Sequence, residues 1–219
     1  MGILTEGING PVSGRVGNVI FYQVGNQTRA RSLPHQPKKK RKPTPLQARQ
    51  RARFTVMQEW LRPIKRLLRF GFKDNASPRS GHNAAMSYNL NKAIMEVTDG
   101  VFAVNPEAFR FSQGPLTPPA NPVAKQDGDV VRFKWDKPGP RDLPGGARTL
   151  LLLHIPSENT SDYHIYGARA YQLEDTIAVN DLRYLVDSPC NAYIAFIDEE
   201  SGLVSNSAYA GTIILEQNP

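Results

Sequence analysis

The side chains of this chain with the clearest capacity to bind something are its lysines and arginines, because they gather at one end. Residues 1–73 contain sixteen of these bases and two acids, Glu6 and Glu59. Residues 111–219 contain eight bases and fourteen acids, and the whole chain has a net charge of +7. Clustered cationic groups bind phosphates or acidic protein surfaces. The front of the chain is therefore expected to face a polyanionic or acidic partner.

The candidate binding residues form three groups along the chain. Two arginines alternate within an expected strand and so share one of its faces. A proline-bracketed run of five bases follows, which is typical of a nuclear-import or polyanion-binding patch and equally of a solvated linker. No other feature suggests a nuclear protein, so import is not expected. The third group has helical spacing. The full set is Arg29, Arg31, Lys38, Lys39, Lys40, Arg41, Lys42, Arg49, Arg51, Arg62, Arg66, Arg69 and Lys73.

Catalytic signatures are missing from the sequence. It has no G-x-S-x-G elbow, P-loop, dinucleotide glycine fingerprint or H-E-x-x-H motif. His154, His164 and Asp162 would suit a metal if their strands were neighbours, but they lack ligand-type spacing. The acidic turn at residues 198–200 is read as solvated, with calcium binding as the weaker alternative. We expect a protein that is not an enzyme, with no catalytic residues, metal, cofactor or small-molecule substrate.

Cysteine content and hydropathy indicate the cellular compartment that is expected for the chain. The single cysteine, Cys190, excludes an internal disulfide and a cysteine metal cluster, and its apolar surroundings predict a buried side chain. The first residues have neither a basic segment nor a long apolar segment typical of a signal peptide. No apolar run approaches the ~20 residues of a membrane-spanning helix. We expect synthesis in the cytoplasm without membrane insertion, followed by assembly into a particle or leaderless export as alternatives.

Residues 1–43 are predicted to form a glycine-rich arm and a basic linker. Residues 19–24 have the β-branched and aromatic content of a strand, and Gly25-Asn26 is typical of a hairpin turn. Residues 27–33 would return as the second strand. Because an isolated hairpin is marginal in water, the arm needs a surface to lie on.

Residues 44–110 are predicted to be helical. Thr44, Pro45 and Gln47 form the signature of a helix start with a capping box. Pro63 should kink or split this helix, and Gly71 should end it. A second helix is expected over residues 82–97, stopped by Asp99-Gly100. The first helix carries one apolar stripe at steps of three and four: Phe54, Met57, Leu61, Ile64, Leu68 and Phe72.

Residues 111–219 change to a period of two, which is typical of strands. Val131, Phe133 and Trp135 alternate with bases, as in a half-buried strand. Short strands at this spacing predict an antiparallel β-sandwich of fibronectin type III or immunoglobulin-like form, and hence an α+β chain. We expect residues 115–219 to fold alone. The further expected strands are 149–155, 163–171, 176–179, 193–197 and 209–215.

Four segments of the sequence carry a resemblance: residues 10–19, 42–54, 81–90, and 193–198 with 204–209. Together they resemble a family of uncharacterised, leaderless proteins of about this length from Bacteroidota. The resemblance implies a shared architecture and supplies no activity. A shorter likeness, of residues 43–51 after an arginine-bearing hairpin, is to phage-type virion proteins, and it departs from their pattern at Lys42, where an asparagine is expected.

The leading functional hypothesis is a structural or assembly protein, in which the arm and basic helix dock on protein partners or on copies of the chain. The alternative is non-specific nucleic-acid binding by the basic front half. Phe21, Tyr22, Phe54 and Trp60 lie near the bases and would be available for stacking.

Overall fold

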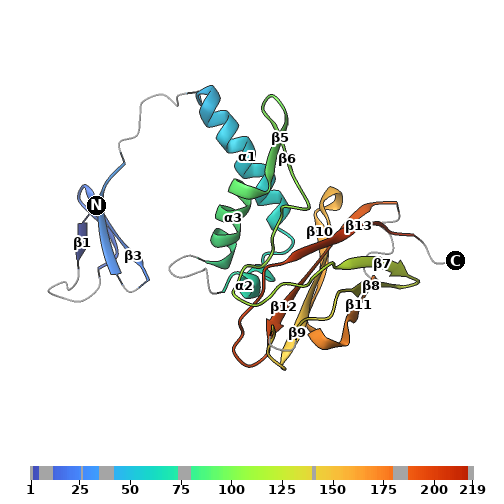
Figure 1. Ribbon diagram of the computed structural model, residues 1–219. Coiled ribbons are helices and arrows are strands. Elements are labelled where there is room, and N and C mark those ends of the chain that lie inside the picture. Colours follow the sequence, from blue (N-terminus) through green and yellow to red (C-terminus); the bar gives the residue numbers. More distant parts are fainter. Residues whose placement is uncertain are drawn as a thin grey trace. The chain divides into compact units, whose positions relative to one another are not determined.

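The computed structural model describes residues 2–4, 12–25, 27–34, 42–73, 80–139, 142–179 and 187–216. The chain forms two compact units, Met1–Pro43 and Thr44–Pro219 (Figure 1). Antiparallel sheets dominate, with a few helices in the second unit. Among the described helices, none has the length and apolar character needed to span a bilayer.

The first unit is a four-stranded antiparallel sheet with the order β1-β4-β3-β2. Its centre is the predicted hairpin, which is confirmed. Two strands of three residues extend the hairpin on both sides, and they escaped prediction because three residues carry no readable period. The strands are β1 (Gly2–Leu4), β2 (Gly14–Val16), β3 (Val19–Val24) and β4 (Gln27–Ser32).

The first helix of the second unit, α1, spans Pro45–Leu61 and begins as predicted. The Thr44 hydroxyl accepts a hydrogen bond from the Gln47 amide at 3.3 Å, and the Gln47 side chain accepts one from the Thr44 amide at 3.1 Å. The helix ends before Pro63, and the short helix α2 (Leu68–Gly71) follows. Of the predicted stripe, Phe54 is 50% exposed. The other five members, Met57, Leu61, Ile64, Leu68 and Phe72, are fully buried.

The second helix ends earlier than the expected range of residues 82–97. Helix α3 spans Gly81–Lys92 and is capped by the Ser80 hydroxyl. A hairpin of β5 (Ile94–Thr98) and β6 (Val101–Val104) follows. Here the β-branched residues prefer strands, and Asp99-Gly100 forms the hairpin turn, with Gly100 at φ 76°.

Two further antiparallel sheets lie in the second unit. A four-stranded sheet has the order β10-β9-β12-β13, and a three-stranded sheet has the order β11-β8-β7. All the predicted strands of this region are present, together with β7. The bounds are β7 (Val123–Asp127), β8 (Val130–Lys134), β9 (Ala147–Ile155), β10 (Thr160–Arg169), β11 (Glu174–Ala178), β12 (Pro189–Asp198) and β13 (Ala208–Ile214), with 3-10 turns at Pro156–Glu158 and Ala170–Gln172.

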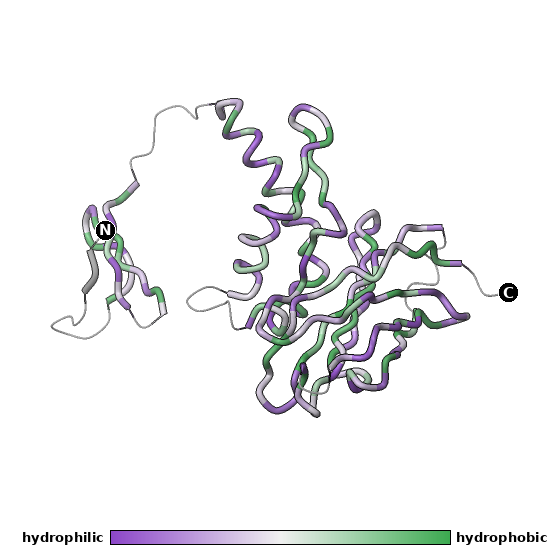
Figure 2. The backbone as a smooth tube through the Cα atoms, viewed as in Figure 1, coloured by the Kyte–Doolittle hydropathy of each residue, from purple (hydrophilic) through white to green (hydrophobic). Residues whose placement is uncertain are grey.

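The four-stranded sheet is covered on both faces. Toward the three-stranded sheet, a core includes Phe133 and Trp135, and the Trp135 ring lies 5.8 Å from that of Phe196. Toward the helices, a second core joins Leu152 and Tyr193 to the buried stripe of α1 and α2. Strands β9 and β12 are consequently buried along almost their whole length, and Figure 2 shows their hydrophobic colouring.

Because both faces of the four-stranded sheet are covered, the alternation of buried and exposed residues that was expected for its strands is not found in all of them. Strand β8 alternates as predicted, with Val131 and Phe133 buried, but β9 and β12 do not. Residues 44–110 share one core with residues 111–219. Independent folding of residues 115–219 is therefore not supported, because α1, α2 and α3 supply part of the core which that segment needs.

Candidate functional site

Three arginines come together on one face of the N-terminal sheet. In the register of β2, β3 and β4, Ile20 lies between Arg15 and Arg31, and Tyr22 lies opposite Arg29. Directly paired residues of antiparallel strands project to the same side of a sheet. Arg15, Arg29 and Arg31 therefore share one face with Ile20 and Tyr22, and we call these five residues the arginine face.

The arginines of this face have no acidic neighbour within the described part of their unit, since none of its described residues is acidic. The Arg31 guanidinium lies 5.5 Å from the centre of the Tyr22 ring, within cation–π range. Arg15 donates to the Gly17 carbonyl at 3.0 Å. Arg29 donates to the Gln27 side chain at 3.4 Å, while its Nε is buried without a hydrogen-bond partner. Arg15 is thus a third arginine on the face that was predicted to carry Arg29 and Arg31.

The opposite side of the same sheet carries a group of apolar side chains beside the polar residues Gln23 and Ser32. Val16 pairs with Val19, and Phe21 pairs with Ala30, so these side chains share the other face. Val16 is 62% exposed and Val19 37% exposed. Among residues 12–25 and 27–34, none belongs to a hydrophobic core, and Thr28 is the one that is buried. We call Val16, Val19, Phe21 and Ala30 the valine face.

The remaining predicted bases do not form one surface. Arg49 is ion-paired with Glu96, and its guanidinium lies 5.9 Å from the centre of the Phe102 ring. The helical spacing expected for Arg62, Arg66, Arg69 and Lys73 does not produce one continuous face, because the helix breaks between Leu61 and Leu68. Residues 38–41 lie outside the described residues. The other predicted bases, Lys42, Arg51, Arg62, Arg66, Arg69 and Lys73, are all exposed.

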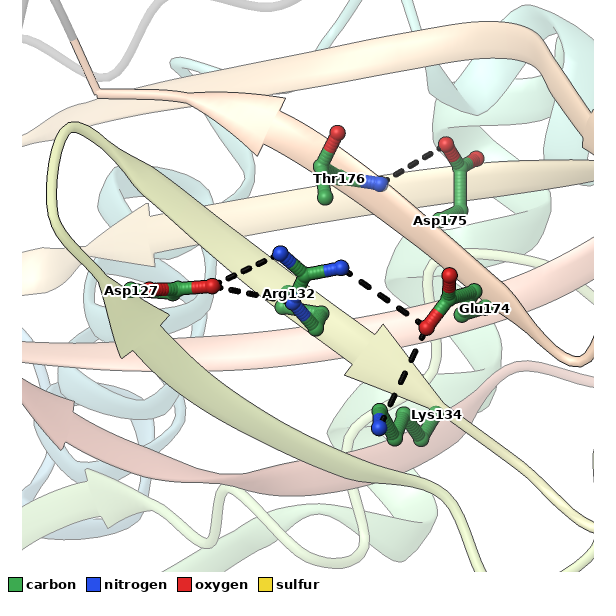
Figure 3. A network of polar contacts seen from close by, with 6 residues as sticks. All are labelled: Asp127, Arg132, Lys134, Glu174, Asp175 and Thr176. Atoms are coloured by element: carbon green, nitrogen blue, oxygen red, sulfur yellow. Dashed lines mark hydrogen bonds and ion pairs between the residues drawn. The ribbon is translucent and has the colours of Figure 1, made fainter.

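An open groove of about 540 Å³ lies on the outer side of the three-stranded sheet. Arg132 contacts Asp127 at 2.7 Å and Glu174 at 3.7 Å, and Lys134 lies 3.9 Å from Glu174 (Figure 3). The hydrogen bonds that Arg132 donates to the Asp127 carboxylate, aided by the negative charge of Asp127, raise the pKa of Arg132 above its usual value. Because these bases already have carboxylate partners, the groove is poorly suited to an anion.

The suggested metal ligands are on different sides of their sheet. His154 on β9 pairs with Ser161 on β10, whereas Asp162 pairs with Leu153. Because side chains alternate along a strand, Asp162 and His164 project to one side of the sheet and His154 to the other. His154 is buried toward the helices, and His164 is exposed. No group of three potential metal ligands is found within the described residues.

The acidic turn has a structural explanation. Asp198 accepts hydrogen bonds from the amide and the hydroxyl of Ser201, at 3.0 and 2.5 Å. The hydroxyl bond is the main reason why the pKa of Asp198 lies below its usual value. This carboxylate closes the turn after β12, so the calcium alternative has no support from its geometry.

The buried cysteine matches its expected role. Cys190 is fully buried in β12, and burial raises the pKa of its thiol to about 12. A thiol with so high a pKa carries almost no thiolate at neutral pH and is a poor nucleophile.

Sequence reasoning missed Arg15 as a member of the arginine face. Its membership depends on the pairing of a three-residue strand with β3, and neither residue type nor spacing fixes that register. The one available signal was Gly17-Asn18 before Val19, which is turn chemistry between two strands.

Comparison with known proteins agrees with the predicted membership in an uncharacterised family. No curated protein matches the chain. The model of a family of unknown function (DUF6266) matches residues 11–211, which is most of the chain. The chain therefore belongs to the family of unknown function DUF6266.

Proposed function

We propose that the protein is a non-enzymatic structural or assembly protein that associates with copies of itself through the valine face. The observation that carries the proposal is that Val16 and Val19 are exposed, and that none of residues 12–25 and 27–34 joins a hydrophobic core. Sheets are stable when a second layer covers their apolar face.

A second copy is the partner that this face fits. Two equivalent valine faces can cover each other around a twofold axis, which is the commonest arrangement of homo-oligomers. The short outer strands β1 and β2 also leave edges to which another strand can add. The charge difference between residues 1–73 and residues 111–219 adds attraction between neighbouring subunits.

In this proposal the second unit is the part presented outward. Its two packed sheets would be a fibronectin type III or immunoglobulin-like module, which carries no activity by itself. A phage-like particle or a filament is the kind of assembly in which such a subunit would serve. The short likeness of residues 43–51 to virion proteins supports this proposal.

Light scattering on the full chain tests the proposal. We expect an oligomer that the double variant Val16→Glu/Val19→Glu converts to monomer, because two carboxylates would be buried in the contact. The control is Val123→Glu/Ile214→Glu, which alters two strand residues of the second unit with exposures of 49% and 50%. A wild-type monomer at high concentration and low salt would contradict the proposal.

A further inference from the structure

The arginine face combines charge with an aromatic ring. Strands lie ~4.8 Å apart, so Arg15 on β2 and Arg31 on β4 project about 10 Å apart on the two sides of Ile20. Tyr22 lies two residues further along β3, with Arg29 opposite it and the Arg31 guanidinium over its ring. We propose that the arginine face binds single-stranded nucleic acid, with phosphates on the arginines and a base on Tyr22.

The residue types favour a single strand over a duplex. Guanidinium groups bind phosphate oxygens through two parallel hydrogen bonds and also stack on planar rings, which ammonium groups do not do. All three bases of the face are arginines. An aromatic side chain on an open sheet stacks a base whatever its identity, and only unpaired bases can reach it. Tyr22 is half-buried, so its ring is held by the sheet while remaining partly accessible.

An acidic protein surface fits the arginine face less well. Among the chain's own acids, several already have partners: Asp127 and Glu174 contact Arg132, and Glu199 contacts Arg148 at 2.8 Å. Bases 38–42 follow the sheet in the chain and would add to the attraction for a long polyanion.

This binding is separable from self-association. Arg31 pairs with Ile20, while the neighbouring Ala30 pairs with Phe21, so the arginine face and the valine face are the two sides of one sheet. Both sides can therefore be occupied at once. A variant of one face leaves the side chains of the other unchanged.

Fluorescence anisotropy with a labelled single-stranded oligo-dT of 20 nucleotides tests the proposal on the full chain. We expect binding at 50 mM salt that weakens with rising salt. Replacing Arg15 and Arg31 together by glutamine should reduce the slope of log K against log salt by about 1.4, at ~0.7 for each phosphate that is no longer neutralised. The charge-matched control, Arg51→Gln/Arg66→Gln, changes two exposed arginines of the second unit and should reduce it less.

The tyrosine variants test stacking separately from charge. Tyr22→Leu should weaken binding about 5- to 150-fold with little change in the salt slope. Tyr22→Phe should retain the affinity, because the ring and not the hydroxyl contacts the base. Circular dichroism confirms that each variant keeps its sheet.

Four results would overturn the proposal. The first is no binding of oligo-dT at 50 mM salt, and the second is an equal loss in the control variant. The third is equally tight binding of a duplex of the same length, with no effect of Tyr22→Leu, which would show a duplex-phosphate surface. The fourth is equally tight binding of polyglutamate, also insensitive to Tyr22→Leu, which would show an acidic protein partner.

Discussion

The indole of Trp60 in α1 lies edge-on against the imidazole of His154 in β9, with ring centres 4.8 Å apart and an interplanar angle of 68°. His154 is fully buried, and its ring nitrogens have no hydrogen-bond partner among the described residues. Burial lowers the pKa of His154 to about 4. The contact therefore holds a neutral histidine between the helices and the four-stranded sheet.

Stability should fall in mild acid because of this residue. Below pH ~6.5 His154 is protonated in the unfolded chain, whereas in the folded chain it stays neutral until the pH falls to about 4. The contribution of neutral His154 to the free energy of unfolding is fully present above pH ~6.5. It is lost as the pH falls toward 4, by about 3 kcal/mol in total. Urea unfolding at pH 7.5, 6 and 5 measures this loss.

The matching variants separate His154 from other titrating groups. His154→Phe keeps the ring contact with Trp60 and should flatten the pH dependence. His164→Phe alters an exposed histidine of the neighbouring strand and should leave the dependence intact. If both variants behave alike, His154 is not the group responsible.

Gly71→Ala should destabilise the protein, although alanine is usually favoured in helices. A Cβ at Gly71 would lie 2.1 Å from the Phe111 carbonyl oxygen, and the neighbouring backbone is fixed by a 2.8 Å hydrogen bond from Gln113 to Gly71. Relieving this clash should cost about 3 kcal/mol. Thermal unfolding measures the cost, and Gly145→Ala, where no atom lies within 4 Å, should change stability little.

Neighbouring residues of β9 should be equally sensitive to truncation. Leu152 belongs to the core on the helical side and Leu153 to the core between the sheets. Each leucine-to-alanine change should cost about 2–5 kcal/mol. In a sheet with one solvated face, one of the two would be tolerated. Denaturant titration of both variants decides between these arrangements, and a loss below ~1 kcal/mol at Leu152 would contradict the helix-covered face.

The division of the chain gives a test with fragments. A fragment of residues 44–219 retains both hydrophobic cores and should unfold cooperatively. A fragment of residues 115–219 loses the helical side of its sheet, exposing Tyr193 and Leu152, and should aggregate or unfold without a transition. A cooperative transition in the shorter fragment would show that the helices are dispensable.

Local signals in the sequence were sufficient for several elements. Thr44, Pro45 and Gln47 identify the start of α1 because a capping box uses neighbouring residues only. The alternation of Val131 and Phe133 identifies β8 for the same reason.

Features that depend on distant pairing were not predictable in this way. Ile94 and Val97 continue the helical spacing of Met86 and Leu90, which favours a helix up to Val97. They form a strand instead because β6 pairs with β5. The covering of β9 on two faces follows from the packing of α1. The apolar run at residues 150–153 was its available signal, since strands buried on both faces are continuously apolar. Arg15 joins the arginine face through register alone.

The covering of the central sheet by helices that precede it has a consequence for biosynthesis. Met57 and Leu61 leave the ribosome before their packing partners, and Tyr193 follows Leu61 by roughly 130 residues. At ~5–20 residues per second, the nascent helices keep their apolar stripe in water for on the order of 10 s. During that interval the growing chain is expected to expose apolar surface of the kind that chaperones bind. The yield of folded protein should therefore respond to translation speed over residues 93–198 more than over residues 1–43.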